Sequence, residues 1–159
     1  MTAILHRAGD RLKLLQRSKS IAVVGMSSKS SRASHFVVTY LLGSTDFDVY
    51  FVNPRETEIM GRKVYPSLTE IPVQLDIVDV FRRIDDLPAV TADAIAAGAG
   101  AVWFQLGLRH EGAAAAAVEA GLDVVQNRCL KVEHARFRGG LHTAGFNTGV
   151  IDSRRTRLI

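Results

Sequence analysis

The sequence contains almost no cysteine and no long apolar run, and both absences narrow the class of protein. Cys129 is the single cysteine in 159 residues, so an internal disulfide is excluded and a reducing compartment, the cytoplasm, is expected. No run of about 18 apolar residues occurs, which argues against a membrane-spanning helix. The charged segment 1–20 also lacks the apolar centre of a secretory signal. We therefore expect no membrane partner.

Patterns typical of metal sites and of several enzyme classes are also missing. The five histidines lack metal-ligand spacing, and neither the G-x-S-x-G motif of serine hydrolases nor a phosphate-loop lysine motif occurs. Acidic residues lie in or beside one expected strand without an evident acid–base pair: Asp76, Asp79, Asp85 and Asp86. We therefore expect no metal and nominate no catalytic residue, which favours a binding protein over an enzyme.

Positive charge is present but concentrated at one end of the chain. The formal net charge is +4 and the pI is about 9.6. Residues 138–159 contribute +3 of this charge, through Arg138, Arg154, Arg155 and Arg157 against Asp152. Because the remaining residues are almost neutral, the overall charge does not favour a nucleic-acid partner.

Short apolar runs alternate with helical patterns through most of the chain. Strands are expected over 21–25, 48–53, 75–81, 101–106 and 122–125. Helices are expected over 4–17, 35–44 and 111–120, and one is expected to begin at Pro88. This alternation predicts the α/β class, with a Rossmann-like doubly wound parallel sheet of about five strands in the order 3-2-1-4-5. Residues 58–72 could add a short strand and a turn of helix.

The chain length predicts one folded domain followed by a short tail. A composition of 47% hydrophobic and 23% charged residues is ordinary for a globular protein, and we assign residues 1–137 to the domain. Residues 138–159 contain four glycines and no sustained periodicity. This glycine-rich C-terminal tail could be mobile, or it could dock on the domain, on a second copy in a homodimer, or on another protein.

The expected topology locates the candidate binding site. Ligands of such sheets bind beyond the carboxyl ends of the strands, near the point where the strand order reverses. Topology therefore selects the segments that follow the expected strands, residues 25–32, 53–55, 81–83, 105–109 and 126–129. Within them the candidates for ligand binding are Gly25, Met26, Ser27, Ser28, Arg32, Asn53, Pro54, Arg55, Phe81, Arg82, Gln105, Gly107 and Cys129.

The loop after the first strand has the composition of an anion site. Residues 25–32 lead from a strand into a helix, so free backbone N–H groups and the helix dipole face the loop. Lys29 and Arg32 add charge that suits a diphosphate, although serine-rich segments also cap helices. The dinucleotide fingerprint G-x-G-x-x-G is incomplete here, because its glycine positions hold Gly25, Ser27 and Ser30. The loop therefore argues against a standard NAD site.

The other strand ends offer groups for the rest of a nucleotide ligand. Asn53-Pro54-Arg55 stands where an acidic residue is expected for NAD. A basic residue here suits a phosphate on the ribose, as in NADP or coenzyme A. Alternatively, the segment could simply end the strand. Phe81 could lie against adenine and Arg82 could bind phosphate, or they could be a core residue and a solvated charge. Gln105 offers an amide, Gly107 allows close approach or a turn, and Cys129 is either a reactive thiol or a small buried residue.

A resemblance to a known family rests on segments that occur in a fixed order: IAVVGMSS, YFVNPR, VYPSL, DIVDVFRR, AVWFQLGL and VVQNRCLKVEH. Over roughly residues 10–137 the chain resembles the small stand-alone coenzyme A (CoA) binding proteins. Their Rossmann-type fold is similar to the CoA-binding domain of the succinyl-CoA synthetase α subunit. The resemblance implies that CoA binds through the candidate residues at 25–28, 53–55, 81–82 and 105–107.

The chain also differs from the pattern of that family. Ser30 and Ser31 stand where a proline is usual, and Asn127 precedes Arg128-Cys129 where an aspartate is usual. The phosphorylated histidine and the nucleotide-binding partner of the synthetases have no counterpart in this length. We therefore expect a non-catalytic protein that binds CoA or acyl-CoA. The alternative is an NADP-type oxidoreductase or redox sensor, which Arg55 favours and the missing glycines oppose.

Overall fold

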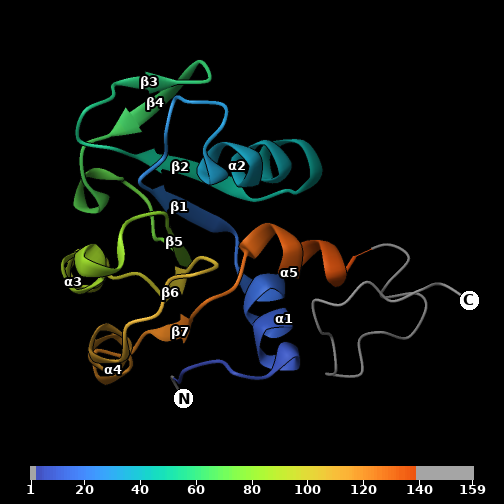
Figure 1. Ribbon diagram of the computed structural model, residues 1–159, viewed down its shortest axis with the longest axis vertical. Helices are drawn as coiled ribbons and strands as arrows, with labels where there is room; N and C mark the ends of the chain where they lie inside the picture. Colours follow the sequence, from blue (N-terminus) through green and yellow to red (C-terminus); the bar gives the residue numbers. More distant parts are fainter. Residues whose placement is uncertain (1–2, 139–159) are drawn as a thin grey trace, which may run out of the picture.

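The computed structural model describes residues 3–138, which form a sheet covered by helices on both faces (Figure 1). Short 3-10 turns are labelled η. In chain order the elements are α1 (Ala8–Arg17), β1 (Ser20–Val24), α2 (Ala33–Ser44), β2 (Asp48–Val52), β3 (Glu58–Ile59), β4 (Arg62–Tyr65), η1 (Leu68–Glu70), β5 (Ile77–Val80), η2 (Ile84–Asp86), α3 (Leu87–Ala96), β6 (Ala101–Phe104), α4 (Glu111–Glu119), β7 (Asp123–Val125) and α5 (Leu130–Arg136). Apart from Arg138, the expected C-terminal tail lies outside the described residues.

The α/β class is confirmed, but the strand number and order differ from the prediction. The sheet has seven strands in the order β3-β4-β2-β1-β5-β6-β7. Residues 58–72 supply β3 and β4, and β4 pairs in parallel with β2 through Phe51 and Val64. The third strand of the Rossmann order is therefore β4, and the expectation that residues 75–81 occupy that edge was wrong.

Burial explains why β4 and β5 take these places. Every residue of β5 is buried, as expected of a strand with neighbours on both sides and helices on both faces. In β4, Arg62 and Lys63 are exposed, and charged side chains suit a strand near the edge of a sheet. β5 pairs in parallel with both β1 and β6, so it lies in the centre of the sheet.

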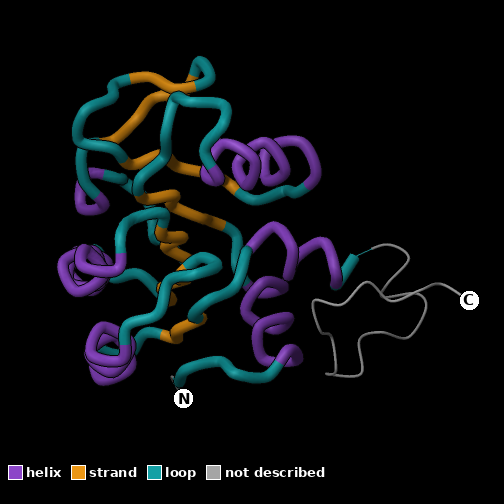
Figure 2. The backbone as a smooth tube through the Cα atoms, viewed as in Figure 1, coloured by secondary structure: helices purple, strands orange, loops and turns teal. Residues whose placement is uncertain are grey.

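Helices lie on both faces of the sheet (Figures 1 and 2). Alternating side chains of the strands build two apolar layers, one on each face. In β1, Ile21 and Val23 face the layer that contains α1, α2 and α5. Ala22 and Val24 face the opposite layer, which contains α3, α4 and η1. The apolar run without polar alternation thus predicted a strand buried on both faces correctly.

The N-terminal helix begins later than the sequence pattern suggested. α1 starts at Ala8, and the residues before it run along the edge of β7. Leu5 N–H donates to the Val124 carbonyl at 2.7 Å, and Val124 N–H donates to the Ala3 carbonyl at 3.0 Å. Ile4 forms a parallel bridge with Val124. These contacts cover backbone groups that an edge strand would leave unpaired, which explains why this segment is not helical.

A buried ion pair joins α1 to α5. The Nε of Arg11 lies 3.1 Å from Oε2 of Glu133, and both side chains are almost fully buried, at 3% and 2% exposure. Arg136 and Arg128 approach Oε1 of the same carboxylate at 3.5 and 3.9 Å. The indole N–H of Trp103 donates to the Arg128 carbonyl at 2.8 Å. Together these contacts fix the segment that leads from β7 into α5.

Candidate functional site

Two joined clefts lie at the carboxyl ends of the central strands, where the strand order reverses. The chain passes from β1 to β2 and β4 on one side, then returns to β5, β6 and β7 on the other. A main cleft of about 660 Å³ and an outer cleft of about 610 Å³ open beside this point. They share four lining residues: Gly25, Arg32, Phe81 and Arg82. Topology therefore predicted the place of these two clefts.

Gly25 allows the backbone segments at this point to approach closely. Its φ is +83°, and a Cβ built on it would lie 2.3 Å from the Phe81 carbonyl oxygen. The Gly25 N–H donates to the Val52 carbonyl at 3.0 Å, and the Phe81 N–H donates to the Val24 carbonyl at 2.8 Å. Both the backbone conformation and the packing exclude any side chain here. The end of β1 is thus bare backbone that faces the clefts.

The loop after β1 combines hydroxyl groups used for its own folding with positive charges left open. Ser27 Oγ accepts from the Lys29 N–H at 3.1 Å, and Ser34 Oγ accepts from the Ser27 N–H at 3.2 Å. Lys29 and Arg32 line the main cleft, and neither has a carboxylate partner within residues 3–138. The serines therefore shape the turn, and the cations remain available to an anion.

The outer cleft adds further positive charge. Arg55 and Arg83 line it beside Arg82, and Arg82 donates to Asp86 at 3.2 Å. Arg55 has no ion-pair partner among the described residues. Within the part of the chain that the structure describes, Asp86 is the only carboxylate that lines this cleft. The formal charge of the chain without residues 138–159 is close to neutral, because acidic residues elsewhere offset these arginines. The overall charge therefore gave no sign of this local cluster.

Asn53 links the ends of β1 and β2. Its Nδ2 donates to the Met26 carbonyl at 2.8 Å, and its Oδ1 accepts from the Arg55 N–H at 2.8 Å. These contacts form a strand-ending turn, which was one of the two interpretations of this segment. Asn53 and Pro54 also line the outer cleft, so the same turn presents Arg55 there.

The structure brings most of the candidate residues together. Those around the main cleft are Gly25, Ser27, Arg32, Phe81, Arg82, Gln105 and Cys129. Those around the outer cleft include Asn53, Pro54 and Arg55.

Three further candidates lie outside both clefts. The Met26 side chain is fully buried in the core, and Ser28 is exposed and donates to Glu56 at 2.9 Å. Gly107 forms a turn with φ +88°, in which its N–H donates to Asn127 Oδ1 at 2.7 Å.

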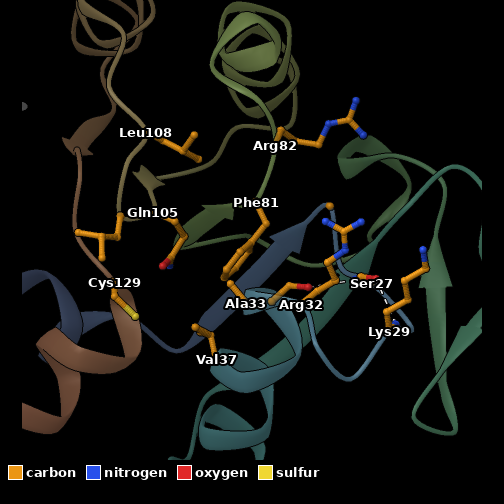
Figure 3. A pocket seen from close by; sticks show the side chains of 13 residues that line it. Ser27, Lys29, Arg32, Ala33, Val37, Phe81, Arg82, Gln105, Leu108 and Cys129 are labelled. Atoms are coloured by element: carbon orange, nitrogen blue, oxygen red, sulfur yellow. Dashed lines mark hydrogen bonds between the residues drawn. The ribbon is translucent and has the colours of Figure 1, made fainter.

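The main cleft has one charged and one uncharged end (Figure 3). We call the part formed by Ser27, Lys29, Arg32 and Arg82 the basic end. We call the part formed by Val37, Gln105, Leu106, Leu108 and Cys129 the uncharged end. Phe81 lies between them, from the loop after β5. Leu106 and Leu108 lie in the segment after the fourth expected strand, which topology selected. Sequence reasoning missed Val37, because an apolar residue in a helix carries no motif.

A buried carboxyl group lies beneath the uncharged end. Asp79 is fully buried in β5, and Nε2 of Gln105 donates to its Oδ1. Its Oδ2 has no hydrogen-bond partner within the described chain. Burial raises the pKa of Asp79 to about 8, and the hydrogen bond from Gln105 opposes this only in part. At neutral pH the carboxyl is therefore protonated. The signal for this buried carboxyl in the sequence was an acidic residue inside an otherwise apolar strand.

Cys129 is an ordinary protonated thiol in this structure. It is partly buried, and burial is the main cause that raises its pKa. Asp79 also raises the pKa of Cys129, whereas Lys131 and backbone hydrogen bonds lower it. The Arg128 guanidinium turns instead toward Glu133. The interpretation of Cys129 as a small buried residue is thus favoured over a thiolate activated by its basic neighbours.

Residues 3–138 contain no group of three or more His, Cys, Asp and Glu side chains that could hold a metal ion. No helix in this part of the chain has the length and apolarity needed to cross a membrane.

The joined clefts thus combine open cations, a bare backbone turn and an apolar extension. Such a set can bind a phosphorylated ligand that has a long uncharged arm.

Comparison with known proteins agrees with this geometry. A family model described as a CoA binding domain matches residues 19–135. The uncharacterized protein YneT of Bacillus subtilis is 41% identical over 123 residues, which cover 77% of this chain and 90% of that protein. The solved structure of a hypothetical protein from Pyrococcus horikoshii is 41% identical, with a TM-score of 0.77 over 83% of this chain and 92% of that one.

A larger relative shows where else this domain occurs. The ADP-forming acetate–CoA ligase II of Archaeoglobus fulgidus is 30% identical over 135 residues, which cover 82% of this chain. This chain spans only 20% of that ligase. The matches confirm the resemblance noted in the sequence, and the chain belongs to the CoA-binding domain family.

Proposed function

We propose that this protein binds CoA or an acyl-CoA in the joined clefts and does not itself transform the ligand. The observation that carries the proposal is the bare backbone at Gly25, which lines both clefts together with cations that have no carboxylate partner within residues 3–138: Lys29, Arg32 and Arg55. Arginine and lysine bind phosphate oxygens through charge-assisted hydrogen bonds. A glycine at the end of a strand allows a diphosphate to approach the backbone.

The residues present fit the successive parts of CoA. The diphosphate would lie at the basic end, beside Lys29, Arg32 and Arg82. The 3′-phosphate of the ribose would lie in the outer cleft, where Arg55 is available, and Phe81 would pack against the adenine. The bound ligand supplies a thiol or a thioester, and this chain supplies only the groups that hold it.

The uncharged end suits the remaining part of the ligand. The pantetheine arm of CoA is long and uncharged, and it ends in sulfur. The lining by Val37, Leu106 and Leu108 matches such an arm, and Gln105 offers an amide for hydrogen bonding. In this orientation the sulfur would lie beside Cys129. A cleft with cations at both ends would have pointed to a different ligand.

Three features support binding without catalysis in this chain. Asp79 is fully buried beneath the cleft, and burial holds Cys129 as a thiol. Asp86 is engaged with Arg82. No free acid–base pair therefore faces the ligand within residues 3–138. We propose that the protein acts in the cytoplasm, alone, as a homodimer or through another protein that recognises the bound form.

The alternative is an NADP-dependent protein, and one observation favours it. Arg55 lies in the turn after β2, in the region from which Rossmann domains recognise the phosphate on an adenosine ribose. Against this, Ser27 occupies the second glycine position of the dinucleotide motif and its Oγ is tied to the Lys29 N–H. The nicotinamide would also have to lie in the largely apolar uncharged end.

Calorimetric titration with CoA, dephospho-CoA, NADP and NAD separates the two functions. We expect CoA to bind most tightly and dephospho-CoA, which lacks the 3′-phosphate, to bind more weakly by about tenfold. Arg55→Ala should remove most of the difference between CoA and dephospho-CoA. The control is Lys13→Ala, which removes an exposed cation on α1. Tighter binding of NADP would establish the alternative, and no binding of any nucleotide would overturn both.

A further inference from the structure

The asymmetry of the main cleft bears on which acyl group the protein can accept. Among the described residues that line this cleft, the cations without an ion-pair partner are Lys29 and Arg32, and both lie at the basic end. The other end presents Val37, Leu106 and Leu108 around Gln105 and Cys129. If the diphosphate lies at the basic end, any acyl group on the ligand sulfur enters apolar surroundings.

The cations closest in sequence to the uncharged end are either close to carboxylates or have only a weak electrostatic effect on it. Arg128 lies 3.9 Å from Glu133, and Arg109 lies 3.9 Å from Glu111. Lys131 lowers the pKa of Cys129 less strongly than burial raises it, and Lys131 is not among the described residues that line the cleft. Among the described residues that line the uncharged end, an anion would therefore meet no unpaired cation.

The Asp79–Gln105 pair fixes what the uncharged end can offer. Gln105 donates one Nε2 hydrogen to Asp79 Oδ1 below the cleft. A primary amide has a second N–H and a carbonyl oxygen, and Gln105 lines the cleft with its side chain. It is therefore a neutral hydrogen-bonding group in a defined orientation. It suits a thioester carbonyl, which needs one donor, better than a carboxylate, which needs several.

We infer that the uncharged end accepts a free thiol or a short uncharged acyl thioester and rejects acyl groups that end in a carboxylate. The inference rests on the CoA binding proposed above, which brings the ligand sulfur to Gln105 and Cys129. Transfer of a carboxylate from water into surroundings without a charge partner is strongly unfavourable. The cleft thus selects among acyl-CoA species by charge at the end opposite to the phosphates.

Butyryl-CoA and succinyl-CoA form a matched pair for the test. Both carry four-carbon acyl groups, and succinyl differs by a terminal carboxylate in place of a methyl group. Calorimetric titration of the full chain at pH 7 should give similar dissociation constants for CoA, acetyl-CoA and butyryl-CoA. Succinyl-CoA should bind at least about tenfold more weakly than butyryl-CoA.

A charge-introducing variant tests the electrostatic cause directly. Leu106 is 72% exposed, so Leu106→Lys can be introduced without disturbing the core. Leu106→Gln is the uncharged control of similar length. Leu106→Lys should bind succinyl-CoA several-fold more tightly than Leu106→Gln does, because it supplies the missing cation. Butyryl-CoA should bind both variants alike, and thermal unfolding confirms that both are folded.

The possible results separate this inference from the proposed function. Equal binding of butyryl-CoA and succinyl-CoA would overturn the inference and leave CoA binding intact. The same conclusion follows if succinyl-CoA is weaker but Leu106→Lys and Leu106→Gln do not differ, since size rather than charge would then decide. If CoA itself fails to bind, the proposed function falls and the inference falls with it.

Discussion

Replacement of Asp79 by asparagine should stabilise the protein and change how its stability depends on pH. The carboxyl is fully buried, one of its oxygens has no hydrogen-bond partner in the described structure, and burial raises its pKa to about 8. An unfolded aspartate has a pKa of about 3.9. Between these values the folded state holds a proton that the unfolded state has released. The free energy of unfolding must therefore fall as pH rises from about 4 to about 8.

The size of the effect follows from the two pKa values. One bound proton changes the free energy of unfolding by about 1.4 kcal/mol per pH unit, so the loss between pH 5 and pH 7 is about 2.7 kcal/mol. Asparagine has nearly the same shape and still accepts the hydrogen bond from Gln105, but it cannot ionise. The difference in free energy of unfolding between Asp79→Asn and the natural sequence should therefore rise by about 2.7 kcal/mol from pH 5 to pH 7.

Chemical denaturation at pH 5, 6 and 7 measures this difference. His134 acts with the opposite sign, because burial lowers its pKa and its protonation destabilises the fold at low pH. That contribution is present in both proteins and cancels in the difference. Asp46→Asn, which alters an exposed carboxylate, is the control. Its free energy of unfolding should change with pH in parallel with that of the natural sequence. Parallel curves for Asp79→Asn over the same range would refute the idea that Asp79 is held protonated.

Three other expectations follow from the described contacts. Arg82→Ala should weaken CoA binding by more than about tenfold, since one charge-assisted hydrogen bond contributes roughly 1.5–3 kcal/mol; unchanged affinity in calorimetry would remove Arg82 from the site. Glu133→Ala should cost about 3–5 kcal/mol in urea unfolding, because it leaves the Arg11 guanidinium buried without a partner; a loss below about 1 kcal/mol would contradict that role. Cys129 should react with iodoacetamide more slowly than a free thiol at pH 7.5, since burial raises its pKa, and bound CoA should slow it further. Alkylation at the rate of a small thiol would show that the uncharged end is more open than described.

The sequence alone predicted which segments form strands better than it predicted which strands pair with one another. Apolar runs such as residues 21–24 reveal a buried strand, because burial on both faces leaves no polar alternation. Which strand lies beside β2 depends on pairing between separate segments, and the partly exposed residues 62–65 suit this place near the edge better than the wholly buried residues 77–80. A local pattern contains no information on that choice. The strand ends, and with them the position of the clefts, did not depend on it.

The candidate site divides along the same line. Residues at strand ends, such as Gly25 and Arg82, could be named because topology brings all strand ends to one edge. The environment of Cys129 could not, because its sequence neighbour Arg128 turns to Glu133 while Asp79 approaches from another strand. Asp79 itself was visible as an acid in an apolar strand, but its partner Gln105 follows a different strand. Local sequence thus indicates position, and long-range packing decides chemical state.

The contacts between the two ends of the described chain have a consequence for how the protein folds. Ala3 bonds to Asp123, and Arg11 bonds to Glu133, so partners more than a hundred residues apart meet at one edge of the sheet. During synthesis β7 and α5 emerge after the other strands and helices of the described chain, and only then can the N-terminal segment and α1 find their places. Closing so long a loop is entropically costly and slows folding. Because Cys129 lies at the start of α5, the uncharged end of the main cleft is completed in this final step. A ligand that engages it would therefore favour the fully closed chain over any partly folded form.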